Sequence, residues 1–149
     1  MATNYRTVHT LDAHHVADLM ELYRDEWWTN ERTADEVRTL LVCSDLVIGF
    51  CDEKDNRLIA FARVLTDQVF RAFIFDVIVA ADHRGSGLGH RLMTELLAHP
   101  MLRDVELVEL YCRPELVAFY ESLGFTTPDS AVVLMRRRVQ STPPTILSS

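Results

Sequence analysis

One turn in the middle of the chain combines the residue types that bind phosphate groups. It follows an apolar stretch ending at Ala80, and its residues are Arg84, Gly85, Ser86, Gly87, Leu88, Gly89 and His90. Glycine leaves the main chain open to a ligand, and the first turn of a helix starting there has N–H groups without intrahelical partners. These donors, the positive end of the helix dipole and the guanidinium of Arg84 all attract an anion. The turn therefore predicts a phosphate site at the start of a helix.

Other phosphate motifs do not match this spacing. The dinucleotide-binding fingerprint requires glycine at the position of His90, and it requires two mononucleotide-binding halves where this chain has one strand–helix–strand unit. The nucleotide phosphate loop requires Gly-Lys followed by Ser or Thr, which the turn lacks. The alternative without a ligand is a helix start packed closely on a strand. Because helix starts prefer Ser, Thr or Asp caps, several glycines with an arginine favour the anion site.

Composition and charge narrow the class of protein. The chain has 149 residues, of which 48% are hydrophobic and 25% are charged, as expected of one globular domain with its own core. A net charge of -7 leaves no broad basic surface for a nucleic-acid backbone. No apolar run approaches the ~20 residues of a membrane span, and the first residues lack the pattern of a signal peptide. We expect a cytoplasmic protein that binds neither nucleic acid nor membrane.

Cysteine and histidine are not grouped in the manner of metal ligands. Cys43, Cys51 and Cys112 are odd in number and widely spaced among apolar neighbours, which favours reduced thiols over disulfides or a zinc site. The histidines also lack a matching ligand cluster. We therefore predict no metal site, and we expect His83 and His90 to lie near the phosphate turn.

Hydrophobic periodicity predicts the elements that position this turn. In the first half of the chain these are a strand over 5–10, a helix after Asp12, a helix after Thr33, and hairpin strands over 46–52 and 57–65. Asp12 has the residue type of a helix cap, and Thr33 with Glu36 has the spacing of a capping box. The pattern predicts two helices followed by antiparallel strands.

The second half of the chain predicts a pair of parallel strands. In order, it contains a strand over 72–80, a helix over 87–98, a strand over 105–112, a helix over 115–123 and a strand over 131–139. The first three elements form one right-handed strand–helix–strand unit. Pro114 suits the first turn of the short helix, and Gly124 suits its left-handed end. The sequence thus predicts an α/β domain over 1–140 with a mixed, mostly antiparallel sheet, and a flexible tail over 141–149.

Two motifs in this order resemble the GCN5-related N-acetyltransferase (GNAT) family. The first is the phosphate turn entered from the strand residues FDVIV, and the second is AFYESLGF, from Ala118 to Phe125. The resemblance extends from Tyr5 to about Val139. It implies a sheet whose two late parallel strands splay apart, with helices on both faces. It also implies acetyl-coenzyme A as the donor of an acetyl group to an amine, by direct attack in a ternary complex.

The resemblance implies roles for individual residues. The turn from Arg84 to His90 would hold the pyrophosphate, and the backbone of Val77, Ile78 and Val79 would pair with the amides of the pantetheine arm. A main-chain N–H near the end of that strand would stabilise the oxyanion. Tyr120 matches the family tyrosine beside the departing sulfur, where a phenol that is protonated at neutral pH can donate to a thiolate. The alternative for Tyr120 is a buried packing role on an apolar helix face.

The base that deprotonates the acceptor amine is open. Asp76 is the first candidate, because a carboxylate inside an apolar strand is costly unless it is paired or faces a cleft. The equal alternative is a structural Asp76 that accepts hydrogen bonds from the backbone or from an arginine. Asp67 and Glu26 are weaker candidates.

The acceptor and the assembly are the least determined features. A small-molecule amine is expected because the chain has no extended acidic or basic docking run, while a peptide N-terminus or a lysine side chain stays open. Trp27 and Trp28 lie where the first helices of the family border the acceptor site, and we expect one to pack inward and the other to line the entrance. Family members often dimerise, so a homodimer is open as well. The alternative function is a non-catalytic acyl-coenzyme A binding or sensing module.

Overall fold

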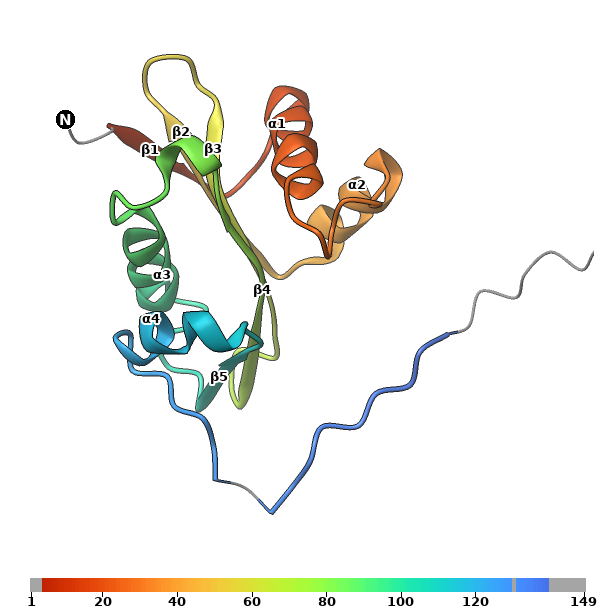
Figure 1. Ribbon diagram of the computed structural model, residues 1–149, viewed down its shortest axis with the longest axis vertical. Coiled ribbons are helices and arrows are strands. Elements are labelled where there is room, and N and C mark those ends of the chain that lie inside the picture. The colour runs from red at the N-terminus through yellow and green to blue at the C-terminus, as the bar shows by residue number, and fades with distance from the viewer. Residues whose placement is uncertain (1–3, 130, 140–149) are drawn as a thin grey trace, which may run out of the picture.

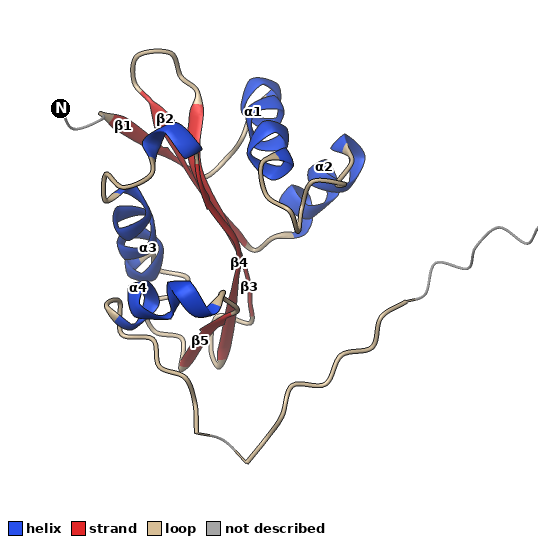
Figure 2. Ribbon diagram, viewed as in Figure 1, coloured by secondary structure: helices blue, strands red, loops and turns tan. Residues whose placement is uncertain are grey.

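A five-stranded mixed sheet with helices on both faces forms the body of the molecule (Figures 1 and 2). The computed structural model describes residues 4–129 and 131–139. Its strands are β1 (Tyr5–Val8), β2 (Leu46–Asp52), β3 (Leu58–Thr66), β4 (Arg71–Val79) and β5 (Leu107–Leu110), which lie side by side in chain order. The first four strands pair antiparallel, and β4 pairs with β5 in parallel. The predicted fold class is confirmed.

The helices cover the two faces of the sheet unequally. On one face lie α1 (Ala13–Arg24) and α2 (Ala34–Cys43), and on the other lie α3 (Leu88–Ala98) and the short α4 (Val117–Glu121) (Figure 1). Asp12 and Thr33 form the N-terminal caps of α1 and α2, as their residue types predict, and each completes a capping box. None of the helices among residues 4–129 and 131–139 is long and apolar enough to cross a bilayer.

The centre of the core is β3. Its residues Ile59 to Ala62 are completely buried, because α1 packs on one side of the strand and α3 on the other. Tyr23 of α1 and Leu92 of α3 are among the buried side chains that enclose it. Burial of each large apolar side chain stabilises the fold by roughly 1.5–3 kcal/mol. The well-packed β3 therefore fixes the position of β4, which pairs with it.

The two parallel strands separate halfway along β4. Their pairing joins only Arg71–Ile74 to Leu107–Leu110, while β4 continues to Val79 in contact with β3 alone. The register with β3 shifts near Asp76, whose φ of 57° lies in the left-handed region, so the strand is bulged there. Beyond Ile74, the edge of β4 that faces away from β3 has no strand partner among the described residues. This is the splay that the resemblance to the GNAT family implied.

The predicted final strand over 131–139 is wrong for the chain taken alone. These residues run as extended chain away from the body and join no strand ladder (Figure 1). Its apolar and β-branched residues favour a strand, but a strand also needs a neighbouring edge to pair with, and within residues 4–129 and 131–139 this segment joins no strand ladder. The predicted tail over 141–149 lies outside the described residues.

Smaller differences concern the ends of elements and the two tryptophans. The predicted helix over 115–123 is a 3-10 turn at Pro114–Leu116 followed by α4, and β5 is shorter than the predicted strand over 105–112. Trp27 and Trp28 lie in turns after α1, and both side chains are exposed. The prediction that one of them packs inward is therefore wrong, because it assumed that the helix continues through both.

Candidate active site

The start of α3 presents main-chain donors that no side chain satisfies. Gly87 is the N-cap residue and offers no side-chain hydrogen bond, and the first helical bond runs from the Arg91 N–H to the Gly87 carbonyl at 3.1 Å. The N–H groups of Leu88, Gly89 and His90 therefore have no intrahelical acceptor. Unpaired N–H groups at the positive end of a helix dipole favour an anion, so this geometry is compatible with the phosphate site, which stays a prediction.

The backbone requires glycine at two of the three glycine positions in the turn. Gly85 and Gly87 have φ values of +79° and +83°, and no atom lies within 4 Å of the position where a Cβ would stand. Any other residue would be strained there, and the space beside the main chain is open. Gly89 lacks a positive φ, and its Cβ would make ordinary 3.6 Å contacts with Phe119 and Val79. Only Gly85 and Gly87 are therefore required by the backbone.

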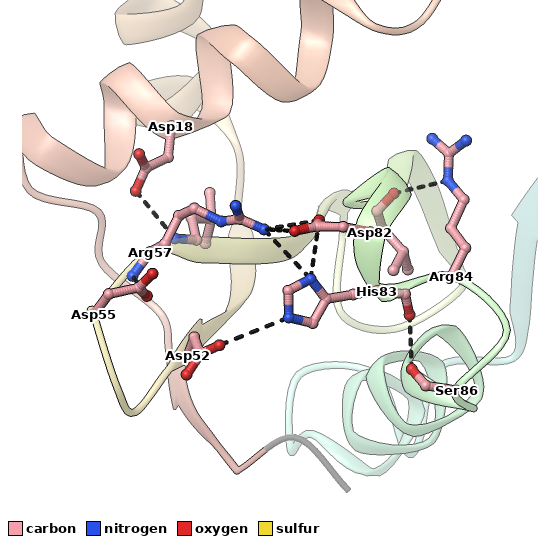
Figure 3. Close-up of polar contacts among 10 residues, drawn as sticks. Asp18, Asp52, Asp55, Arg57, Asp82, His83, Arg84 and Ser86 are labelled. Atoms are coloured by element: carbon pink, nitrogen blue, oxygen red, sulfur yellow. Dashed lines mark hydrogen bonds and ion pairs between the residues drawn. The ribbon is translucent and has the colours of Figure 1, made fainter. Parts of the chain in front are cut away.

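The Arg84 side chain is already occupied by protein groups. Its Nε donates to the Val79 carbonyl at 3.0 Å, and its Nη2 donates to Glu26 Oε1 at 2.9 Å. Figure 3 shows this guanidinium directed away from Ser86, whose hydroxyl donates to the His83 carbonyl at 2.7 Å. Arg84 thus fastens the turn to the end of β4 and to the segment after α1. Glu26, a weak candidate for the base, is the partner of this arginine.

A second polar cluster anchors the other side of the turn (Figure 3). The 3-10 turn Ala81–His83 carries Asp82, which accepts from Arg57 Nη2 at 2.8 Å and lies 3.0 Å from His83 Nδ1. Arg57 and then His83 lower the pKa of Asp82 to about 2. The other nitrogen of His83 lies 3.6 Å from Asp52. His83 therefore lies between Asp82 and Asp52, the last residue of β2, although it is next to the turn in sequence.

Asp76 is the centre of a buried ion cluster. Its Oδ2 accepts from Arg32 Nη1 at 2.6 Å, from Arg63 Nε at 2.7 Å and from the Tyr23 hydroxyl at 3.0 Å, and its side chain is only 5% exposed. Burial by itself would raise the pKa of Asp76. The hydrogen bonds and charges of Arg32 and Arg63 outweigh burial and hold that pKa below its ordinary value. Asp76 is thus an ionised group that ties α1 and the following loop to the bulge of β4.

Sequence reasoning identified Asp76 but missed its partners. Arg63 carried a usable signal, because it is a charged residue inside an apolar strand, as Asp76 is, and the two strands are neighbours. Arg32 and Tyr23 carried no such signal, since one lies in the loop after α1 and the other looks like an ordinary core residue. The sequence left two roles open for Asp76, a base or a structural carboxylate bonded to the backbone or an arginine. The observed contacts with Arg32 and Arg63 are those of the structural role.

Tyr120 approaches from the opposite face of the sheet, on α4 (Figure 1). Its ring packs against Phe119 and Phe125, with centroids 5.0 and 5.9 Å apart, and the residue is 6% exposed. Burial, followed by the nearby Cys112 sulfur, raises the pKa of Tyr120 to about 12. No hydrogen bond joins its hydroxyl to another residue of the described ranges. The phenol is therefore protonated at neutral pH, and its role as a proton donor stays a prediction.

The remaining candidates lie around the site without joining it. Asp67 Oδ1 accepts from the N–H groups of Val69, Phe70 and Arg71, so this weak candidate for the base caps the β3–β4 loop. Cys112 is exposed just after β5. The Arg113 guanidinium lies 4.9 Å from the centre of the Trp27 ring, which brings the end of β5 next to the loop after α1.

Comparison with known proteins identifies the family. The model of the acetyltransferase (GNAT) family matches residues 15–125, and the protein belongs to this family. A solved structure of a protein belonging to the GNAT family from Xanthomonas campestris is 28% identical, with a TM-score of 0.79 and coverage of 100% of both chains.

Curated relatives agree with this assignment. A protein named uncharacterized N-acetyltransferase ycf52 from Porphyra purpurea is 31% identical over 110 residues, or 72% of this chain and 63% of that protein. GCN5-related N-acetyltransferase 1, chloroplastic, from Arabidopsis thaliana is 32% identical over 110 residues, or 72% of this chain and 56% of that protein. The chain thus spans less than two thirds of the length of these relatives. The second relative is named a chloroplastic protein, so the cytoplasmic location expected from this sequence stays a prediction.

The Asp76 cluster predicts a pH-dependent loss of stability. Asp76→Asn keeps a residue that tolerates positive φ but leaves Arg32 and Arg63 without their anion, and we expect a loss of about 3–5 kcal/mol at neutral pH. Because the folded-state pKa is depressed, this contribution is complete above pH ~4 and disappears as the pH falls through the folded pKa. Urea unfolding of the variant and the parent at neutral and acidic pH measures the difference between their unfolding free energies. This difference should be smaller at acidic pH.

Asp104→Asn is the matched control for this substitution, because that carboxylate is 85% exposed. Its stability should follow that of the parent at every pH. Equal stability of Asp76→Asn and the parent at neutral pH would contradict the role assigned to the cluster.

Proposed function

We propose that this protein transfers the acetyl group of acetyl-coenzyme A to an amine by direct attack in a ternary complex. The observation that carries the proposal is the uncapped start of α3, with two left-handed glycines, placed directly after the free edge of β4. A diphosphate needs the first feature, and an extended amide-bearing arm needs the second. The GNAT family in general uses this donor.

Main-chain groups do most of the binding. The N–H groups of Leu88, Gly89 and His90, with the turn from Arg84 to Gly87, would hold the pyrophosphate. The outer edge of Val77–Val79 would pair with the pantetheine amides, as an added strand would. Arg84 forms an ion pair with Glu26, and it would contact a phosphate directly only if this ion pair were broken.

The proposed chemistry assigns one step to each group. The amine nitrogen attacks the thioester carbon, and a main-chain N–H near the end of β4 stabilises the oxyanion that forms. As the C–S bond breaks, Tyr120 donates its proton to the leaving thiolate. With a pKa of about 12, the phenol holds this proton at neutral pH until the sulfur becomes basic enough to take it. Solvent water takes the proton that the attacking nitrogen loses, and the Tyr120 phenolate regains its proton from solvent.

The role of Asp76 as the base stays a prediction, and the geometry gives it an obstacle. Three donors already occupy its carboxylate, and its lowered pKa makes proton transfer from an ammonium, whose pKa is about 10.4, strongly uphill. We propose that Asp76 positions β4 instead. The pH profile of kcat/KM for folded Asp76→Asn decides this, because a positioning role keeps the acidic limb of the parent and a base role removes it.

The acceptor is proposed to be a small-molecule amine. Related chains carry names with different acceptors, since a rice relative is named a serotonin N-acetyltransferase and a soybean relative a histone acetyltransferase. We therefore expect the choice to depend less on the family than on Trp27 and Trp28, which the family resemblance places beside the acceptor site, and on Arg113, which contacts Trp27. Thiol release from acetyl-coenzyme A across a panel of amines separates transfer from mere binding, because a binding module would release none.

Replacement of Gly87 by alanine should weaken coenzyme binding. The methyl group adds backbone strain of about 1–2 kcal/mol at φ +83° and enters the open space beside the turn. We expect the Kd for coenzyme A to rise at least about tenfold in calorimetry. Gly124→Ala is the matched control, since its φ is +92° and its surroundings are equally open. Equal affinities for the two variants would contradict the phosphate site.

Replacement of Tyr120 by phenylalanine should slow transfer without weakening donor binding. Loss of a general acid typically lowers the rate by about 100-fold or more, while the packing of the ring is retained. Steady-state kinetics should therefore show a lower kcat with an unchanged KM for acetyl-coenzyme A. Tyr111→Phe, at an exposed tyrosine after β5, is the control and should keep its activity. Unchanged turnover of the Tyr120 variant would remove the acid role.

A further inference from the structure

Two arginines share one carboxylate at the bulge of β4. Arg32 Nη1 lies 2.6 Å from Asp76 Oδ2, and Arg63 Nε lies 2.7 Å from the same oxygen. We call Arg32 and Arg63 the arginine pair. Despite burial, these arginines lower the pKa of Asp76, so the carboxylate is ionised. Tyr23 is neutral, because burial and then the Asp76 charge raise the pKa of its phenol. Two cations on one anion leave one positive charge in excess.

No second carboxylate of the described residues balances this charge. Within residues 4–129 and 131–139, Asp76 is the one carboxylate that forms an ion pair with either member of the arginine pair. Glu36 also acts on Arg32, but its carboxylate is exposed and accepts from the Thr33 hydroxyl at 2.8 Å. Water and salt screen a charge at such a position. A mostly enclosed cation without its own counterion therefore favours an added anion.

The arginine pair keeps donors for such an anion. Arg63 bonds to Asp76 through Nε, and no hydrogen bond joins either of its Nη nitrogens to another residue of the described ranges. The Arg32 and Arg63 side chains are 25% and 14% exposed, so both can be reached from solvent. Guanidinium groups bind carboxylates through two parallel hydrogen bonds. A carboxylate would balance the excess charge, whereas a phosphate, at about −1.5 to −2, would exceed it.

Aromatic rings continue from the arginine pair along β4. The Arg63 guanidinium lies 4.9 Å from the centre of the Phe75 ring, and the Phe75 and Phe73 ring centres lie 4.8 Å apart. Both phenylalanines are partly exposed, although they belong to a strand of the sheet. Partly exposed rings beside a cation offer a surface to an apolar group whose molecule also carries a negative charge.

This arrangement lies on the face of the sheet that the proposed leaving group does not use. The cluster joins β4 to Tyr23 of α1, whereas Tyr120 belongs to α4 on the opposite face (Figure 1). In the proposed reaction Tyr120 meets the departing sulfur, so the face with α1 and α2 is left for the amine. Asp76 directly precedes Val77, where the proposed pairing with the pantetheine arm begins. An anion on the arginine pair would thus lie beside the reacting carbonyl.

We propose that the acceptor is an amine that also carries a carboxylate and an aromatic group, as an aromatic amino acid does. The arginine pair binds the carboxylate, Phe75 and Phe73 contact the aromatic group, and the amine faces the thioester. Arg32 and Arg63 thereby select the acceptor without taking part in the proton transfers. This inference rests on the proposed acetyl transfer and specifies its acceptor.

Matched amines test this selection in the parent protein. L-Phenylalanine and L-tyrosine carry the carboxylate, whereas phenethylamine and tyramine are the same molecules without it. Thiol release from acetyl-coenzyme A gives kcat/KM for each amine, and each amino acid should exceed its counterpart at least about tenfold, because the charge-assisted pair is lost with the carboxylate. L-Alanine, which lacks the ring, should fall about tenfold below L-phenylalanine. Equal values within either comparison would overturn the proposal.

Arg63→Lys separates carboxylate binding from a structural role. One ammonium group can hold Asp76, but it cannot also present a guanidinium fork to a ligand. The KM for L-phenylalanine should rise at least about tenfold, while the kinetics with phenethylamine stay those of the parent. Arg38→Lys, at an exposed arginine of α2, is the matched control and should change neither. Equal losses with both amines would show a structural role and overturn the proposal.

Calorimetry at saturating coenzyme A distinguishes failure of this proposal from failure of the proposed transfer. L-Phenylalanine should bind at least about tenfold more tightly than phenethylamine. If this difference is present but no amine releases thiol, acetyl transfer is wrong and the carboxylate site is supported. If thiol is released but the amino acids have no advantage over phenethylamine and tyramine, the transfer is supported and the carboxylate site is overturned.

Discussion

The proposed function depends on three main-chain N–H groups that α3 leaves without intrahelical partners at its start. Their exposure follows from Gly87, which supplies a left-handed N-cap without a side chain to cap the helix. Their position follows from β4, because that strand is paired with the buried β3 on one side and delivers the turn at its end. In a chain with net charge -7, such a local cluster of donors is the way to attract a phosphate without a broad basic surface.

Charged clusters fix the geometry around these donors from both sides. Arg57 and Asp82 tie the start of the turn to the β2–β3 hairpin, and Arg84 ties its middle to Glu26 after α1. Asp76 joins α1 and its following loop to the bulge where β4 leaves β5. Exposed ion pairs contribute little to folding stability. Among these contacts, loss of a partner in the buried Asp76 cluster should therefore lower the stability most. That cluster lies beside the point where β4 and β5 separate, and the gap beyond this point receives the extended arm of the donor in our proposal.

Local patterns predicted the fold well wherever the interaction is between neighbours in sequence. The caps at Asp12 and Thr33, the hairpin strands and the glycine turn all depend on a few adjacent residues, and the structure confirms them. Prediction failed where the outcome depends on distant parts of the molecule. The ion pair from Arg32 to Asp76 joins residues 44 positions apart, and no short pattern reports it. The strand predicted over 131–139 failed for the same reason, since its partner edge is not set by its own sequence.

Hydrogen exchange of the turn in the presence of coenzyme A tests the central claim most directly. Saturating coenzyme A should slow exchange at the N–H groups of Leu88, Gly89 and His90 at least about tenfold, because each would donate to the diphosphate. Pantetheine, which lacks the diphosphate, should leave these three amides unchanged. Exchange at the three amides that is the same with and without coenzyme A would contradict the account.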